Sequence, residues 1–118
     1  INDKLGHLGG DHVLSVVARV IKANTRAADF VCRWGGEEFL IVIKDCDEHN
    51  AVLLAEKIRQ ALEQESIIYK NEQIKLTASL GVAVARAGDK LEPVMERADA
   101  AMYGAKKGGR NQVNLGSI

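Results

Sequence analysis

Three stretches of the chain carry apolar residues at the i, i+3, i+4, i+7 spacing that is typical of an amphipathic helix. Their apolar positions are Leu14, Val17, Ala18 and Ile21 in the first stretch, Ala51, Leu54, Ala55, Ile58 and Leu62 in the second, and Leu91, Val94, Met95, Ala98, Met102 and Ala105 in the third. We expect the first helix to begin with Asp11 as its N-cap, after a Gly- and Asn-rich loop, and to end near Asn24. Gly108 and Gly109 are expected to stop the third helix.

Short apolar runs between these stretches predict β-strands. Residues 29–33 and 38–43 flank Gly35-Gly36, and such a pair indicates a hairpin because both turn residues can adopt positive φ. The second run is apolar on successive residues, which is typical of a central strand that is covered on both faces. Shorter runs at 67–69 and 74–76 predict a small hairpin, and further strands are predicted at 77–85 and 112–115. Gly81 marks a bulge or a point of close approach.

The order helix, hairpin, helix, strands, helix, strand predicts an α+β fold, with antiparallel strands on one side and helices packed on the other. One more strand at the start would give βαββαβ, the ferredoxin-like arrangement of many polymerase palms and nucleotide cyclases. The 118 residues suit one domain, residues 1–118, and the 47% hydrophobic content is enough for one core.

The charge balance limits the classes of partner. Lys plus Arg and Asp plus Glu both number 16, so the net charge of zero removes the usual electrostatic case for bulk nucleic-acid or anionic-membrane binding. Cys32 and Cys46 form neither a disulfide framework nor a zinc pattern, and a reducing cytoplasm fits them best. No uninterrupted apolar run approaches the roughly 20 residues of a membrane span.

Two adjacent carboxylates, Glu37 and Glu38, directly follow the Gly35-Gly36 turn. A hairpin needs the glycines, but it does not need two negative charges at the start of an apolar strand. Mg²⁺ prefers oxygen ligands and usually combines one or two carboxylates with substrate phosphates. The alternative is a solvated hairpin tip, where charge keeps a sheet edge soluble.

A basic segment, KKGGR, closes the third helix. Lys106 and Arg110 suit a cationic clamp for a polyphosphate, because both donate charge-assisted hydrogen bonds. The alternative is an ordinary helix C-terminus, where glycine ends the helix and lysine complements the helix dipole.

The opening segment, INDKLGHLGGD, is neither a P-loop nor a G-x-G-x-x-G motif. A carboxylate such as Asp11 can accept two hydrogen bonds from the N1–H and the exocyclic amine of guanine, and Asn2 can add contacts nearby. The alternative is a capping Asp and a turn Asn.

Together these motifs are more specific than each is alone. The segments IND…GH..GD, R.GGEEF and AKKGGRN, in this order and at these separations, resemble the GGDEF family, the diguanylate cyclases. The stretches SLGVA (79–83) and RADAAMYGAKKGGRN (97–111) are similar to the same family, so the resemblance covers essentially the whole chain. Members of the family join two GTP molecules into cyclic di-GMP and release two pyrophosphates, with one GTP on each of two facing domains.

The resemblance implies a cofactor and partners. The cofactor is Mg²⁺ or Mn²⁺, the substrate is GTP, and the catalytic unit is a homodimer of domains. Cyclic di-GMP is the product and a possible inhibitor. In line with the net charge of zero, we expect no nucleic-acid partner. The domain would face the cytoplasm, downstream of a sensory or receiver domain in a parent protein that can itself be membrane-anchored.

The resemblance also assigns roles around the hairpin. Glu37 matches the catalytic carboxylate that binds the metal, and Glu38 matches the adjoining acidic position, with a supporting role near the metal or the ribose. Gly35 and Gly36 match the turn over which the phosphates lie.

The remaining substrate positions lie on the two other motifs. Asn2 and Asp11 match the guanine-reading positions of the family, and Lys106 and Arg110 match its phosphate-binding pair.

An inhibitory site is implied just before the hairpin. Arg26 and Asp29 match the RxxD signature at which product binds in many members, and Lys57 aligns with a basic residue of the second helix that is commonly Arg. Because Lys lacks the planar fork of Arg, Lys57 leaves product inhibition open.

The chain departs from the family pattern at its start. Members carry a strand before IND that supplies a second metal ligand, and this chain begins after it. We therefore expect a fragment of a longer protein that lacks its first strand, an unpaired slot in the sheet, and poor catalysis by these residues alone. The alternative function is a degenerate GGDEF module that binds GTP or cyclic di-GMP and regulates a neighbouring domain.

Overall fold

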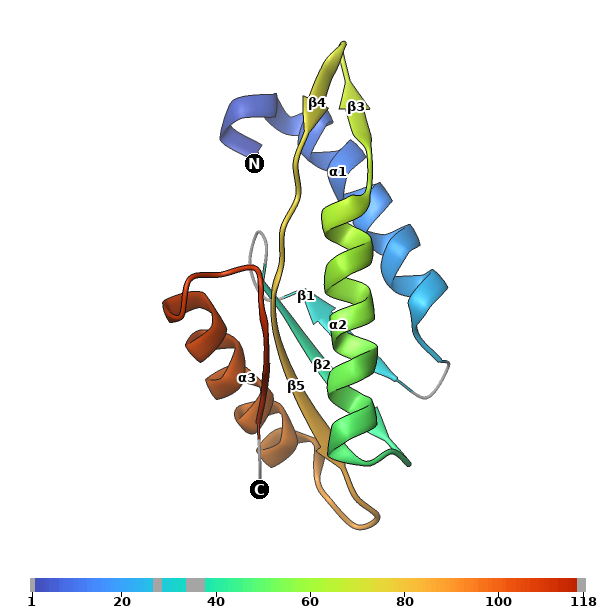
Figure 1. Cartoon of the computed structure of the whole chain (residues 1–118), viewed down its shortest axis with the longest axis vertical. Coiled ribbons are helices and arrows are strands. Elements are labelled where there is room, and N and C mark those ends of the chain that lie inside the picture. Colours follow the sequence, from blue (N-terminus) through green and yellow to red (C-terminus); the bar gives the residue numbers. More distant parts are fainter. Residues whose placement is uncertain (1, 27–28, 34–37, 117–118) are drawn as a thin grey trace.

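The structure is a computed structural model that describes the backbone of residues 2–26, 29–33 and 38–116, and the side chains of these residues from 12 onward except at position 33. The elements in chain order are α1 (Asn2–Asn24), β1 (Phe30–Arg33), β2 (Glu38–Lys44), α2 (Glu48–Gln64), β3 (Ile67–Tyr69), β4 (Glu72–Ile74), β5 (Ser79–Ala85), α3 (Leu91–Lys107) and β6 (Val113–Leu115) (Figure 1). The α+β class that the sequence predicts is confirmed.

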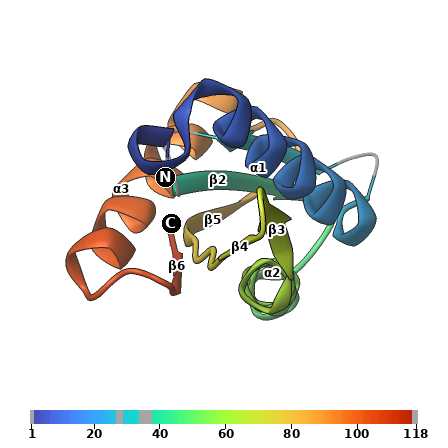
Figure 2. The same cartoon turned by 90° about the horizontal axis from the view of Figure 1, so that it is seen from above.

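The main sheet has the strand order β1-β2-β5-β6, and β3 and β4 form a separate hairpin that projects from one end of the molecule (Figure 1). The three helices are arranged around the main sheet (Figure 2). Within the described residues, no helix combines the length and the apolar character that crossing a bilayer requires.

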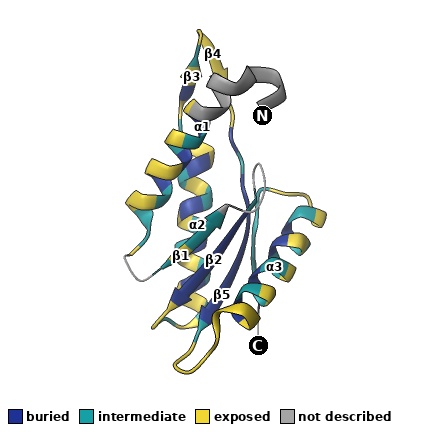
Figure 3. Cartoon of the chain, turned by 180° about the vertical axis from the view of Figure 1, so that it is seen from behind, coloured by how far each residue is buried: buried dark blue, intermediate teal, exposed yellow. Residues whose placement is uncertain are grey.

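The strand β2 is covered on both faces, as its unbroken apolar run predicts. Its residues 39–43 are buried, and the central strands stand out as the most enclosed part of the sheet in Figure 3. Phe39, Ile41 and Ile43 join the core formed with α1 and α2. Leu40 and Val42 point to the other face, where they pack with Val94, Ala98 and Met102 of α3. Successive strand residues face opposite sides of a sheet, so one run fills two cores.

The start of α1 differs from the prediction. The helix begins at Asn2, so the expected loop before Asp11 is wrong from residue 2 onward, and Asp11 lies inside the helix instead of capping it. A glycine inside a helix costs only about 1 kcal/mol relative to alanine. The cost of Gly6, Gly9 and Gly10 is therefore small enough for the helix to extend through them.

The pairing of the strands also differs from the expectation of a mostly antiparallel sheet. The β1–β2 pair is antiparallel, but β2–β5 and β5–β6 are parallel. The reason is the order of the elements along the chain. The chain passes through α2 after β2 and before β5, and through α3 after β5 and before β6. A strand that returns after a helix on one face enters the sheet in the same direction.

The expected unpaired slot is not present among the described strands. The strands β2 and β5 pair directly along seven residues, from Glu38 opposite Ser79 to Lys44 opposite Ala85. Unpaired backbone groups in a sheet are costly, and direct pairing satisfies them.

The small hairpin is shifted relative to its prediction. The strand β4 covers Glu72–Ile74, where residues 74–76 were expected, because Lys70 and Asn71 both have positive φ and form a two-residue turn. Asp47 caps the start of α2 by accepting from the backbone N–H of Asn50 at 2.7 Å. Gly108 ends α3, as the sequence predicts.

Candidate active site

The middle of α3 lies close against the sheet because Gly81 has no side chain. A Cβ atom at Gly81 would lie 1.9 Å from the carbonyl oxygen of Ala98 and 2.5 Å from the backbone nitrogen of Met102. This confirms Gly81 as a point of close approach between strand and helix. The helix is thereby held where its last turn faces the starts of β2 and β5 (Figure 1).

Glu38 and Lys106 meet at this end of the sheet. Glu38 is the first residue of β2, Lys106 lies in the last turn of α3, and the Lys106 Nζ atom is 3.1 Å from Glu38 Oε2. The Glu38 side chain is 17% exposed and that of Lys106 is 40% exposed. A partly exposed pair of this kind contributes about 1 kcal/mol or less, so a ligand with stronger charge can replace either partner.

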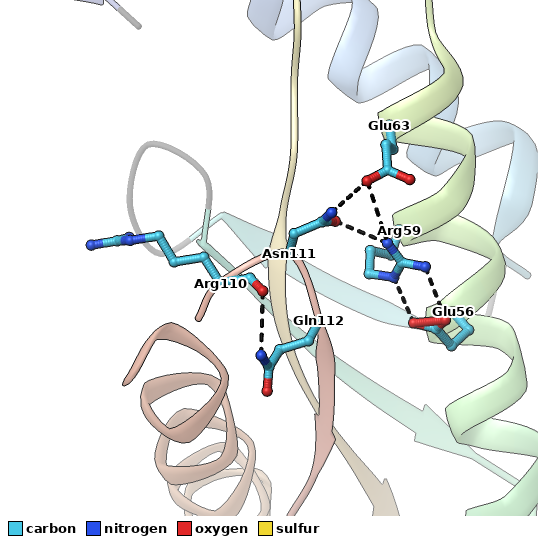
Figure 4. A network of polar contacts seen from close by, with 6 residues as sticks. All are labelled: Glu56, Arg59, Glu63, Arg110, Asn111 and Gln112. Carbon is cyan, nitrogen blue, oxygen red and sulfur yellow. Dashed lines mark hydrogen bonds and ion pairs between the residues drawn. The ribbon is translucent and has the colours of Figure 1, made fainter. Parts of the chain in front are cut away.

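The turn after α3 presents Arg110. The backbone N–H of Gly108 donates to the Gly104 carbonyl at 2.8 Å, and that of Arg110 donates to the Ala105 carbonyl at 3.0 Å. The second bond spans six residues and is the mark of a Schellman motif, with Gly109 at the left-handed position (φ +116°). Arg110 is exposed, and its side chain extends away from α2 (Figure 4).

Arg26 and Asp29 form a closed turn before β1. The Arg26 guanidinium donates to Asp29 Oδ1 through Nη2 at 2.8 Å and to the Lys44 carbonyl at 2.8 Å. The Asp29 side chain is fully enclosed, whereas that of Arg26 is 50% exposed. The hydrogen bond to Asp29 raises the pKa of the Arg26 guanidinium above its ordinary value. Arg26 is thus a fixed, charged and half-exposed group.

Lys57 lies on the exposed face of α2. Among the residues that the structure describes, no hydrogen bond or ion pair joins Lys57 to Arg26 or Asp29. Its place in an inhibitory site stays a prediction.

Five predicted site residues lie outside what the structure describes. Gly35, Gly36 and Glu37 fall in the range 34–37, and the side chains of Asn2 and Asp11 fall in the range 1–11. Their roles in metal binding, phosphate contact and guanine reading stay predictions.

The described donors suit a hard cation only in part. Among the described side chains, no group of three or more His, Cys, Asp or Glu is arranged to hold a metal ion. Mg²⁺ bound with a polyphosphate needs only one or two carboxylates, because the phosphates and water supply the other oxygens. The partly exposed Glu38 carboxylate is of the required type.

Comparison with known proteins decides the family. A sequence profile of the family described as "Diguanylate cyclase, GGDEF domain" matches residues 1–112. Diguanylate cyclase A of Treponema denticola is 42% identical over 116 residues, which cover 98% of this chain and 31% of that protein. The chain belongs to the GGDEF domain family.

Solved structures of GGDEF domains share the fold. The GGDEF domain of DgcB from Caulobacter crescentus, in complex with c-di-GMP, has a TM-score of 0.81 at 36% identity and covers 98% of this chain and 69% of that chain. The active GGEEF domain of a diguanylate cyclase from Vibrio cholerae has a TM-score of 0.79 at 36% identity, over 100% of this chain and 75% of that one. The present chain spans less than a third of the curated relative named above.

Within this GGDEF domain, the structure joins predicted site residues that the sequence left separate. Glu38 and Lys106 are 68 positions apart and form an ion pair, and Arg110 follows in the next turn. Arg26 and Asp29 form their own turn at the other end of β1.

One polar network of the GGDEF domain was not predicted. Arg59 of α2 binds Glu56 through two hydrogen bonds, at 2.6 and 3.1 Å, and donates to Asn111 Oδ1 at 2.9 Å (Figure 4). Asn111 donates in turn to Glu63. The hydrogen bond to Glu56 raises the pKa of the Arg59 guanidinium, so Arg59 stays charged. The i, i+3 and i, i+4 spacing of Glu56, Arg59 and Glu63 was a usable signal for a helix-surface network. No sequence pattern indicated that these residues bind Asn111.

Proposed function

We propose that this domain is a diguanylate cyclase that condenses two GTP molecules into cyclic di-GMP. The observation that carries the proposal is the contact between Glu38 and Lys106, with Arg110 in the adjoining turn, in a chain of the GGDEF family. A carboxylate paired with one cation, with a second cation in the turn that follows, suits a ligand that carries both a bound cation and a polyphosphate.

The reaction is phosphoryl transfer. The 3′-hydroxyl oxygen of one GTP forms a bond to the α-phosphorus of the other, the bond from that phosphorus to the bridging oxygen breaks, and pyrophosphate leaves. The hydroxyl proton passes to a nearby base or to water. The same step in the opposite direction closes the ring, so two GTP give one cyclic di-GMP and two pyrophosphates.

The residues of the chain divide this work. Lys106 and Arg110 bind the triphosphate and offset its charge, and Lys106 exchanges Glu38 for phosphate oxygens when GTP arrives. By the sequence prediction, Glu37 is the catalytic carboxylate that would hold Mg²⁺ or Mn²⁺, and Glu38 supports it near the metal or the ribose. When bound, the cation neutralises charge that develops on the phosphate oxygens. Asn2 and Asp11 read guanine, and Gly35 and Gly36 let the phosphates approach the backbone.

Two domains must face each other for this chemistry, because each holds one GTP. The catalytic unit is therefore a homodimer of domains, and an input domain elsewhere in the parent protein controls how the two meet. DgcB of Caulobacter crescentus, to which this chain is similar, is described in complex with c-di-GMP.

Product inhibition at a second site is part of the proposal. The Arg26 guanidinium is held by Asp29 and the Lys44 carbonyl and is half exposed, so it is oriented to meet a phosphate or a guanine without first losing freedom. Lys57 supplies a second cation from α2. We place the domain in the cytoplasm, where GTP is available.

The test is to incubate the full-length protein with GTP and Mg²⁺ and to look for cyclic di-GMP by mass spectrometry. The Glu37→Gln variant should lose turnover and keep its fold, because glutamine has nearly the shape of glutamate but lacks the charged carboxylate that is proposed to bind the metal. Wild-type activity in Glu37→Gln would overturn the metal assignment. GTP binding without product would favour the regulatory alternative.

A further inference from the structure

The turn that carries Arg110 has an unusual backbone. Three successive residues have positive φ: Gly109 at +116°, Arg110 at +63° and Asn111 at +44°. Glycine adopts such angles freely and Asn does so more readily than most other residues, but Arg does so rarely, and two such residues in succession persist where surrounding contacts determine the conformation. Some other part of the molecule must therefore hold residues 110 and 111.

The side chain of Asn111 makes these contacts, and it makes them to α2. Asn111 Oδ1 accepts from Arg59 Nη1 at 2.9 Å, and Asn111 Nδ2 donates to Glu63 Oε2. Both the acceptor and the donor of the amide are thus used, and both partners are charged. Gln112 adds a local bond, because its Nε2 donates to the Gly108 carbonyl at 2.9 Å.

Arg59 is a firm anchor for the turn. Its side chain is only 14% exposed, its guanidinium plane is fixed by two hydrogen bonds to Glu56, and Glu63 lies 3.8 Å from Nη1. A planar guanidinium with several bonds loses little further freedom when it binds Asn111. We call Arg59, Glu63 and Asn111 the α2 clamp.

The α2 clamp and Arg110, the proposed phosphate-binding residue, lie on opposite sides of one turn. Figure 4 shows the Asn111 side chain directed toward α2, while the neighbouring Arg110 side chain extends the other way. Among the described residues, the Arg110 guanidinium has no hydrogen-bond partner. Fixing Asn111 therefore fixes the backbone from which the Arg110 side chain extends, and none of the described residues holds its guanidinium.

We propose that Asn111, held by Arg59 and Glu63, is a positioning residue that aims Arg110 at the triphosphate of GTP. The proposal rests on the proposed function, because it takes Arg110 as a phosphate-binding residue. Asn111 and Arg59 do not touch the substrate and act only through the direction of Arg110.

The experiment measures the dissociation constant of a non-hydrolysable GTP analogue, with Mg²⁺, on the full-length protein. Asn111→Ala and Arg59→Met should each weaken binding by roughly tenfold, because a charge-assisted hydrogen bond contributes a factor of about 10 to 100. The matched control is Arg19→Met, which removes another paired arginine, one that binds Glu65 at the C-cap of α2. Arg19→Met should leave the affinity unchanged.

The decisive comparison uses an Arg110→Ala background. If Asn111 acts through Arg110, adding Asn111→Ala to Arg110→Ala should weaken binding no further. Multiplied effects in the double variant would show a separate structural role and overturn the proposal. Unchanged affinity in Asn111→Ala, with a weakened Arg110→Ala, would overturn the clamp and leave the proposed function intact. Unchanged affinity in Arg110→Ala would overturn both the phosphate assignment and the clamp.

Asn111→Gly separates the clamp from the backbone conformation. Glycine adopts a φ of +44° at no steric cost but cannot bind Arg59 or Glu63, so the variant should fold and still bind the analogue roughly tenfold more weakly. Binding equal to wild type in Asn111→Gly would mean that the turn alone aims Arg110, and the proposal would be wrong. Far-UV circular dichroism checks that each variant is folded.

Discussion

The close contact between β5 and α3 gives a quantitative prediction for Gly81→Ala. A Cβ atom there would lie 1.9 Å from the Ala98 carbonyl oxygen, 2.5 Å from the Met102 backbone nitrogen and 2.7 Å from Met102 Cβ. Ordinary van der Waals contact begins at 3.4 Å, so the backbone of α3 has to move by about 1.5 Å, the difference between the two distances. Backbone atoms cannot rotate away as a flexible side chain can.

The magnitude follows from the cost of overpacking. An extra carbon in a well-packed core costs typically about 1–3 kcal/mol, and the rigid neighbours of Gly81 place this case at the upper end, near 3 kcal/mol. For a domain of this size, about 3 kcal/mol lowers the melting temperature by roughly 10 °C. Catalytic activity should fall as well, because a shift of α3 would move Lys106 away from Glu38.

Gly88→Ala is the matched control. A Cβ at Gly88 meets nothing within 4 Å, but Gly88 has a φ of +89°, so alanine there suffers backbone strain alone, about 1 kcal/mol. Thermal unfolding followed by circular dichroism should rank the proteins as wild type, Gly88→Ala and Gly81→Ala in falling order. If Gly81→Ala melts within a few degrees of wild type, or above Gly88→Ala, the argument from close approach is wrong.

Two further predictions concern the cationic side chains of Lys106 and Arg26. Lys106→Met should raise the KM for GTP by about tenfold or more, because it removes a charge-assisted contact to phosphate. Lys107→Met, in the same helical turn, is the control, and equal effects of the two substitutions would contradict the role of Lys106. Arg26→Ala should keep the initial rate and raise the cyclic di-GMP concentration needed for half-inhibition by at least roughly tenfold, for the same reason; unchanged inhibition would remove Arg26 from the product site.

The sequence predicted those parts of the fold in which local pattern and tertiary packing agree. The unbroken apolar run 39–43 indicated a strand buried on both faces, and the two cores on either side of β2 confirm it. Gly81 was predicted to mark a bulge or a point of close approach, because a glycine inside an apolar strand indicates one of the two, and its contact with α3 confirms the second.

The remaining features depend on contacts between distant residues. The parallel pairing of β2 with β5 was not predicted, because a hydrophobic pattern fixes which face is buried but not which strand lies alongside. The helical start at Asn2 was missed because the glycines at 6, 9 and 10 were interpreted as a loop, although each costs only about 1 kcal/mol in a helix.

The same limit applies to the site. Family resemblance assigned Glu38, Lys106 and Arg110 to one substrate, and the structure brings Glu38 and Lys106 together. The resemblance could not predict that Arg59 reaches Asn111, 52 residues away, because Arg59 lies in none of the quoted motifs and Asn111 has no assigned role within AKKGGRN.

The most direct test of the central claim is the stoichiometry of the reaction. GTP consumed, pyrophosphate released and cyclic nucleotide formed are measured together for the full-length protein with Mg²⁺, by chromatography and mass spectrometry. The account predicts two pyrophosphates and one cyclic di-GMP for every two GTP consumed. One pyrophosphate with one cyclic mononucleotide per GTP, or GTP binding without pyrophosphate release, would contradict it.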